Sequence, residues 1–145
     1  MSIYVFVYGT LRAGEINDLA QAAAKRGLPA PRPVGPATVP GMLVDFGDWP
    51  GLIPVTDGRR VRGEVYEVPP AFIALMDEIE EYVPGQPCCF VRHEIFARLD
   101  STPQAPPEIL CQYYPIDPAW RGAATDIDGE DWIAHRRGRA NGAPP

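Results

Sequence analysis

Apolar and polar residues change their spacing several times along this chain of 145 residues, and each change predicts a new element. The first apolar run, Ile3 to Tyr8, consists of β-branched and aromatic residues and stops at a glycine, which is typical of a buried strand that enters a tight loop. Later apolar runs are short and are separated by Pro-Gly, Gly-Asp and Asp-Gly turn signals. They predict strands at 34–39, 42–46, 52–55, 60–68, 89–99 and 108–114.

Two segments, 17–25 and 71–82, have the composition and apolar spacing of helices. Asn17 or Asp18 can cap the first helix, and Gly27 is placed to end it. The second follows two prolines, which suit the first turn of a helix because an amide hydrogen is not needed there.

Many short strands with only two clear helices do not match the alternating β-α-β pattern of a parallel sheet. We therefore predict a mixed α+β domain, in which a mainly antiparallel sheet curls into a small barrel flanked by short helices. After Pro115 the regular pattern is weak, apart from an anchor at 127–133. The predicted domain covers 1–134, and 135–145 is expected to be a disordered basic tail.

Composition limits the classes of partner. With 46% hydrophobic and 22% charged residues, the chain is expected to form one soluble domain with a closed core. A formal charge of -6 argues against a general nucleic-acid surface. No apolar run reaches the length of a secretory or membrane segment, so we expect a cytoplasmic protein without membrane contacts, and a monomer by default.

Cysteines and histidines are too few and too poorly spaced for several kinds of site. The three cysteines, of which Cys88 and Cys89 are neighbours, are expected to be reduced and to have packing roles. His93 and His135 are the only histidines, which argues against a zinc site or a Ser-His or Cys-His triad. Glycine motifs for nucleotide phosphates are also missing, so we expect no metal and no organic cofactor.

The loop after the first strand is one candidate site. Successive amides of Gly9, Thr10 and Leu11 would lie at the carboxyl end of the strand, where they could hold a carboxylate. Glycine at its start permits a left-handed backbone and a close approach of other chain segments. The alternative is an ordinary turn that binds nothing.

Glu80 is a second candidate, because the second helix would turn it inward. Counting about 100° per residue from Phe72, the apolar residues form one stripe, and Glu80 falls at about 80°, inside it. An inward carboxylate loses hydration, which raises its pKa toward the range that suits proton transfer. The alternative is a buried glutamate that is bonded to the backbone or to an arginine such as Arg92.

Five short motifs, in this order along the chain, resemble those of the γ-glutamylcyclotransferase-like (AIG2-like) family. They are YGTLR at 8–12, VRGEVY at 61–66, LMDEIEEY at 75–82, FVR at 90–92 and IDGEDW at 127–132. The resemblance implies a barrel-like antiparallel sheet with a cavity at one end. Phe90 departs from the family pattern, because a tyrosine usually stands there.

The resemblance also implies an enzyme that cyclises γ-glutamyl amides without a cofactor. Glu80 would be its general acid/base, which takes a proton from the α-ammonium group of the substrate and returns it to the leaving amine. The products would be 5-oxoproline and an amine or amino acid. The implied substrate-binding residues are Tyr8, Gly9, Thr10, Leu11 and Arg12, with Tyr113 as a further candidate.

Several alternatives stay open at this point. Tyr8 and Tyr113 could hold the ligand or be packed aromatic residues, and Arg12 could orient the loop or be a solvated charge. The enzyme could instead remove a γ-glutamyl protecting group from a biosynthetic intermediate. A non-catalytic module that binds a small carboxylate, or a domain without a pocket, would use the same fold.

Overall fold

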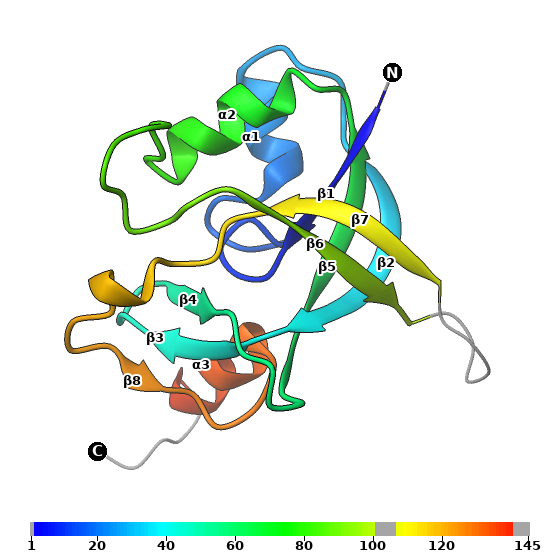
Figure 1. Ribbon diagram of the computed structural model, residues 1–145. Coiled ribbons are helices and arrows are strands. Elements are labelled where there is room, and N and C mark those ends of the chain that lie inside the picture. The colour runs from blue at the N-terminus through cyan, green and yellow to red at the C-terminus, as the bar shows by residue number, and fades with distance from the viewer. Residues whose placement is uncertain (1, 101–106, 141–145) are drawn as a thin grey trace.

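The computed structural model describes residues 2–100 and 107–140, which fold around a closed five-stranded barrel (Figure 1). Around the barrel the strands follow the order β1 (Ile3–Val7), β5 (Arg60–Val68), β2 (Arg32–Pro40), β6 (His93–Leu99) and β7 (Glu108–Tyr113). Neighbours are antiparallel, except that β7 closes the barrel in parallel with β1. The predicted α+β fold with a small, mainly antiparallel barrel is confirmed.

A smaller sheet continues from the barrel strand β2. Its strands lie in the order β4 (Pro50–Ile53), β3 (Met42–Asp45) and β8 (Thr125–Asp126). β3 and β4 form a hairpin with Gly47 and Asp48 at its tip, and the Phe46 amide donates to the Trp49 carbonyl at 3.0 Å. The Gly-Asp turn signal therefore marks a tight hairpin, as the sequence predicts.

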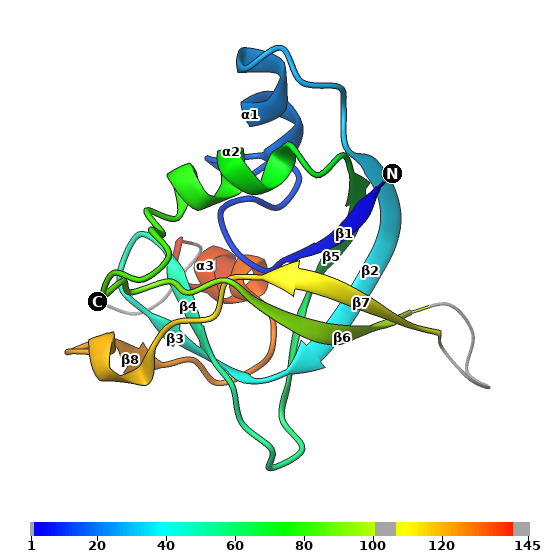
Figure 2. The same ribbon diagram turned by 45° about the horizontal axis from the view of Figure 1, so that its top comes forward.

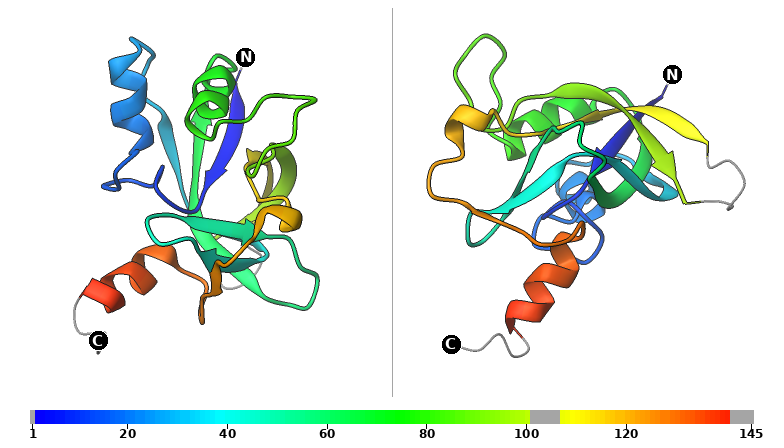
Figure 3. Two further views of the ribbon diagram at one scale, coloured as in Figure 1. Left: turned by 90° about the vertical axis from the view of Figure 1, so that its left-hand side faces the viewer. Right: turned by 60° about the horizontal axis from the view of Figure 1, so that its bottom comes forward.

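The described part of the chain has four helical segments. They are α1 (Leu19–Lys25), α2 (Phe72–Ile79), the short 3-10 helix η1 (Pro118–Trp120) and α3 (Trp132–Ala140). α1 and α2 lie together at one end of the molecule (Figure 2), and α3 lies at the other end (Figure 3). Asp18 caps α1 by accepting from the Ala20 amide at 2.9 Å, and Gly27 follows with a φ of 67°, as predicted. Each helix in the described ranges is too short or too polar to cross a bilayer.

Residues of β1 alternate between two apolar clusters, because successive side chains of a strand point to opposite faces. Phe6 and, just beyond the strand, Tyr8 belong to the cluster inside the barrel, whereas Val5 and Val7 face the cluster beneath α1 and α2. Gly63 of β5 lies against this strand, and a Cβ there would come 2.2 Å from the Val7 carbonyl oxygen. The glycine of the second motif is therefore required by packing.

The structure differs from the sequence prediction at the ends of two helices. α2 stops at Ile79 rather than at Tyr82, because Glu80 is its C-cap and Glu81 has a left-handed φ of 56°. Residues 135–140, predicted to belong to a disordered tail, instead continue α3, and 141–145 lie outside the described residues. Residues 101–106, between the predicted strands at 89–99 and 108–114, lie outside them as well.

Candidate functional site

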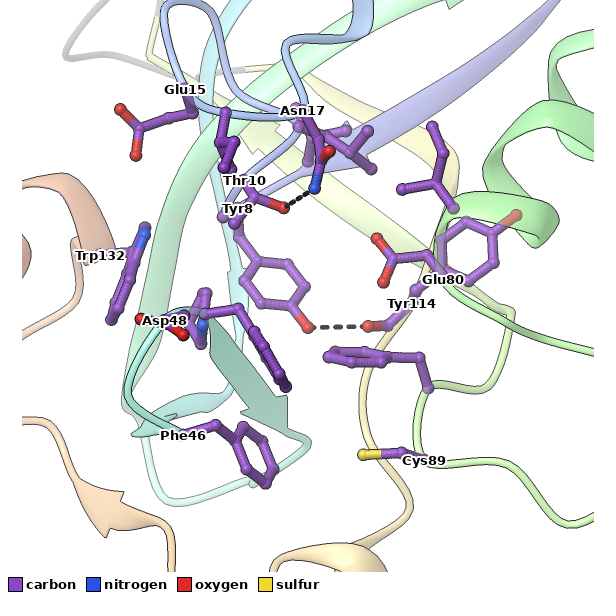
Figure 4. Close-up of a pocket in the computed structure, with 18 of the residues that line it drawn as sticks. Tyr8, Thr10, Glu15, Asn17, Phe46, Asp48, Glu80, Cys89, Tyr114 and Trp132 are labelled. Atoms are coloured by element: carbon purple, nitrogen blue, oxygen red, sulfur yellow. Dashed lines mark hydrogen bonds between the residues drawn. The ribbon is translucent and has the colours of Figure 1, made fainter. Parts of the chain in front are cut away.

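A cavity of about 930 Å³ lies between the loop after β1, the β3–β4 hairpin, the end of α2 and the start of α3 (Figure 4). Its walls are formed by residues 6–11, 14–17, 46, 48–50, 79–81, 87–90, 114, 120, 132 and 136. The cavity brings together Tyr8, Gly9, Thr10, Leu11 and Glu80, which come from two distant motifs. The other two predicted site residues, Arg12 and Tyr113, do not line it.

The loop at 9–12 is shaped by close packing and by its own carbonyl groups. A Cβ on Gly9 would come 2.6 Å from Pro50 Cγ, so the absence of a side chain allows β4 to approach. The φ of Gly9 is not left-handed, so close approach and not backbone conformation is the reason for glycine here. The carbonyls of Gly9, Thr10 and Leu11 accept amides farther along the chain at 2.9–3.1 Å. Within the described residues, the amides of these same three residues have no protein acceptor. The loop can therefore offer donors to a ligand with oxygen atoms.

Arg12 holds this loop from behind. Its Nε donates to Glu64 Oε2 at 2.9 Å, and its Nη1 donates to Asp131 Oδ1 at 3.0 Å. Glu64 also accepts the Ala13 amide at 3.1 Å, and Asp131 also caps α3 through the Ile133 amide at 2.9 Å. Since the Arg12 side chain is only 10% exposed and bonds both carboxylates, it orients the loop. Of the two roles that the sequence left open, these contacts favour orientation of the loop over a solvated charge.

Glu80 points into the cavity from the end of α2, toward Tyr8 (Figure 4). Burial raises the pKa of its carboxyl group from 4.5 to about 8. Among the described residues, no hydrogen bond or ion pair engages this carboxyl group. Arg92, the alternative partner, pairs instead with Asp77 at 3.4 Å and lies 5.5 Å from the Tyr82 ring centroid. Glu80 therefore faces inward, as the helical wheel predicts, and Arg92 does not neutralise it.

Tyrosines form the wall between Glu80 and the hairpin. The Tyr8 hydroxyl donates to the Tyr114 carbonyl at 2.8 Å and accepts the Leu52 amide at 3.2 Å. Its pKa lies well above the usual value, first because of burial and then because of the negative charge of Glu80. Tyr113 is buried inside the barrel, whereas the next residue, Tyr114, lines the cavity and donates to Asp77 Oδ1 at 2.5 Å. Tyr113, which the sequence left as either a ligand contact or a packed aromatic residue, is thus one residue away from the tyrosine that lines the cavity.

Sequence reasoning also missed other residues of the cavity wall. They include Trp49 and Asp48 of the hairpin, Trp120 of η1, and the pair Glu15 and Arg136. Arg136 Nη2 donates to Glu15 Oε2 at 2.7 Å, which joins α3 to the first loop. The available signal was a set of tryptophans in turns and caps, where they fit no strand or helix stripe.

Comparison with known protein families agrees with the resemblance that the five sequence motifs indicate. A model of the family described as "Gamma-glutamyl cyclotransferase, AIG2-like" matches residues 5–134. The chain belongs to this family. The AIG2-like motifs thus coincide with the parts that build or support the cavity: the loop, the glycine of β5 that packs against β1, the end of α2 and the cap of α3.

Individual relatives agree with this family. The chain is 40% identical, over 79 residues, to "Gamma-L-glutamyl-butirosin B gamma-glutamyl cyclotransferase" of Niallia circulans; the match covers 54% of this chain and 46% of that protein, so it spans about half the relative's length. An AIG2-like protein of Mus musculus has the same fold with a TM-score of 0.66 at 22% identity, covering 92% of both chains. YkqA of Bacillus subtilis gives a TM-score of 0.68 at 23% identity, covering 99% of this chain and 44% of that one.

Proposed function

We propose that this AIG2-like protein cyclises a γ-glutamyl amide, releasing 5-oxoproline and an amine or amino acid. The observation that carries the proposal is the Glu80 carboxyl group, which faces a cavity without a protein partner among the described residues. The same cavity is lined by the loop whose three amides have no protein acceptor. Membership of the family and the name of the Niallia circulans relative support the reaction class.

The loop would hold the γ-glutamyl group, and Glu80 would move the proton. The amides of Gly9, Thr10 and Leu11 bind oxygen atoms of that group, which places its α-ammonium nitrogen within reach of Glu80. The ionised Glu80 takes a proton from the ammonium, and the freed amine attacks the γ-carbonyl to close a five-membered ring. Glu80 then gives the proton to the leaving nitrogen, and the C–N bond breaks as the carbonyl reforms. The ring nitrogen loses its second excess proton through Glu80 to the departing amine, which leaves as an ammonium ion. Because the nucleophile and the carbonyl belong to one molecule, orientation supplies much of the acceleration.

The raised pKa of Glu80 suits both halves of this transfer. The substrate's α-amino group has a pKa at or above the value of about 8 found at a peptide N-terminus. A carboxyl group with a pKa of about 8 therefore takes its proton at a smaller cost in free energy than an ordinary glutamate would. An ordinary glutamate with a pKa of about 4.3 would be a much weaker base and would return the proton too readily. Desolvation in the cavity is therefore the physical source of the proposed activity.

Replacing Glu80 by glutamine tests the proposal. We expect Glu80→Gln to lower kcat about 10²- to 10⁴-fold, which is the usual contribution of a general acid/base, with release of 5-oxoproline as the readout. The matched control is Glu78→Gln on the same helix, where the exposed carboxylate pairs with Arg26 outside the cavity. This control should keep activity within about twofold. Undiminished turnover in Glu80→Gln would disprove the role of Glu80.

The substrates for this test are a panel of γ-glutamyl amines and γ-glutamyl amino acids. Turnover of any member supports a cyclotransferase, and the preferred member separates the general enzyme from one that removes a protecting group. Binding without turnover in both the native protein and Glu80→Gln would identify a non-catalytic module for small carboxylates.

A further inference from the structure

The mouth of the cavity is unusually rich in exposed aromatic surface. All three tryptophans of the chain line the cavity, and two of them are close to half-exposed: Trp49 at 46% and Trp120 at 47%. Trp49 stacks on Phe46, with ring centroids 6.4 Å apart and planes inclined by 28°. Half-exposed tryptophans at the edge of a cavity are typical of a surface that a ligand covers.

An acidic side chain stands within this aromatic surface. Asp48 lies at the tip of the β3–β4 hairpin, between Gly47 and Trp49, and lines the cavity (Figure 4). Within the described part of the chain, its carboxylate has no ion-pair or hydrogen-bond partner. We call Phe46, Asp48, Trp49 and Trp120 the aromatic rim.

Most charged residues that line the cavity are acidic. Four acidic residues line it, namely Glu15, Asp48, Glu80 and Glu81. Among the described residues, Arg136 is the only cation in the lining, and its Nε and Nη2 both donate to the Glu15 carboxylate. Within the described lining, no unpaired cation is therefore left to bind a carboxylate on the leaving group of the substrate. Asp48, in contrast, is an unpaired anion at the mouth of the cavity.

We propose that the aromatic rim binds the leaving amine of the substrate, and that this amine carries a second positive charge. The inference rests on the proposed cyclotransferase activity. A γ-glutamyl group fills only part of about 930 Å³, so a substantial leaving group must occupy the rest. An ammonium group that contacts the aromatic rim gains cation–π attraction from a tryptophan and ionic attraction from Asp48. A leaving amino acid would place its carboxylate against the same acidic surface.

Three γ-glutamyl amides with a chain of the same length test this inference. Their amine parts are diaminopentane, hexylamine and aminohexanoate, which end in an ammonium, a methyl and a carboxylate group. We expect kcat/KM for the ammonium compound to exceed that for the methyl compound about tenfold, and the carboxylate compound to be the poorest. The ammonium preference should weaken at high salt, because the rim is exposed.

Variants of the rim show whether these residues cause the preference. Asp48→Asn and Trp120→Leu should each reduce the ratio of kcat/KM between the ammonium and methyl compounds about three- to fivefold. Using a ratio cancels any general loss of activity. The control is Asp128→Asn, an exposed carboxylate that does not line the cavity, and its ratio should equal that of the native protein. An unchanged ratio in both rim variants would overturn the inference.

Binding to Glu80→Gln, measured by calorimetry with the same three compounds, separates this inference from the proposed function. Turnover of all three compounds at similar rates would support the cyclotransferase and overturn the role of the rim. If none is turned over, preferential binding of the ammonium compound would support the rim alone. Equal or absent binding without turnover would overturn both.

Discussion

At the scale of single residues, the proposed role of Glu80 predicts how activity responds to pH. In the proposed mechanism its carboxyl group must be ionised to accept the substrate proton, and burial raises its pKa to about 8. We therefore expect kcat/KM to rise with pH up to about 8 and then to fall as the α-ammonium group of the substrate loses its own proton. A pH profile of 5-oxoproline release checks this. An acid limb near 4.5 instead would show that another group, or an unburied Glu80, limits the rate.

The same raised pKa makes a prediction about stability. The folded protein binds the Glu80 proton more tightly than the unfolded chain, so this contribution is fully present below about pH 4.5 and is lost as pH rises through about 8. Glutamine at this position does not ionise, so the stability of Glu80→Gln does not fall in this way. The thermal midpoint of Glu80→Gln should therefore rise relative to that of the native protein as pH increases from about 4.5 to about 8, and should exceed it by roughly 2–8 °C at pH 9. Glu78→Gln, measured in parallel, should show no such trend.

Gly9 gives a second test at this scale. A methyl group there would come 2.6 Å from Pro50 Cγ, and the resulting overpacking costs about 1–3 kcal/mol. Gly9→Ala should therefore lower the free energy of unfolding by that amount and raise KM, since the loop must move away from β4. The control is Gly138→Ala in α3, where a Cβ has nothing within 4 Å and helix propensity should add about 0.5–1 kcal/mol. Equal stabilities of the two variants would contradict this account of the loop.

Glu80 and the tyrosines show what the sequence reveals about single residues and what it does not. Glu80 could be predicted because the apolar stripe of α2 continues to the residue that caps the helix. Tyr114 could not, because the choice between it and Tyr113 depends on strand register. A shift of one residue turns every side chain of a strand to the opposite face. The sequence identifies the strand but not which of the two tyrosines faces the barrel.

At the scale of elements, Arg12 joins three segments that are far apart in sequence. It contacts Glu64 of β5 and Asp131 at the start of α3, so the first, second and last motifs meet at one guanidinium group. Arg12→Met would leave both partly buried carboxylates without this cation, which typically costs about 3–5 kcal/mol. Urea unfolding checks this value. Arg59→Met, which removes an exposed pair with Asp57, should cost less than about 1 kcal/mol.

α3 shows why some elements were missed. Its sequence after Trp132 is basic and has a weak apolar stripe, so propensity and pattern predict a frayed tail. The helix is held by partners from elsewhere: Arg12 contacts its cap, His135 Nε2 lies 2.8 Å from Asp45 Oδ2, and Trp132 is fully buried. The barrel strands were predictable because their apolar runs and turn signals are local. α3 was not, because its stability depends on tertiary contacts.

At the scale of the whole molecule, the cavity is closed by the two ends of the described chain. The loop after β1 forms one wall and α3 forms another, and Glu15 and Arg136 connect them through two hydrogen bonds of 2.7 and 3.1 Å. The Glu15 side chain is only 7% exposed, whereas that of Arg136 is 39% exposed. The arginine therefore covers a carboxylate that would otherwise lack a partner at the cavity wall.

Removing this connection should loosen both walls together. We expect Arg136→Met to speed hydrogen exchange in the amides of 10–17 and in the first turns of α3, while the barrel strands β1 and β5 keep their protection. KM for γ-glutamyl substrates should rise about two- to tenfold, because the loop amides then spend less time in the binding geometry. Arg137→Met, at the next and exposed position, is the matched control and should change neither quantity. If exchange accelerates in α3 but not in the loop, the two walls are independent and the ion pair is a local feature of the helix.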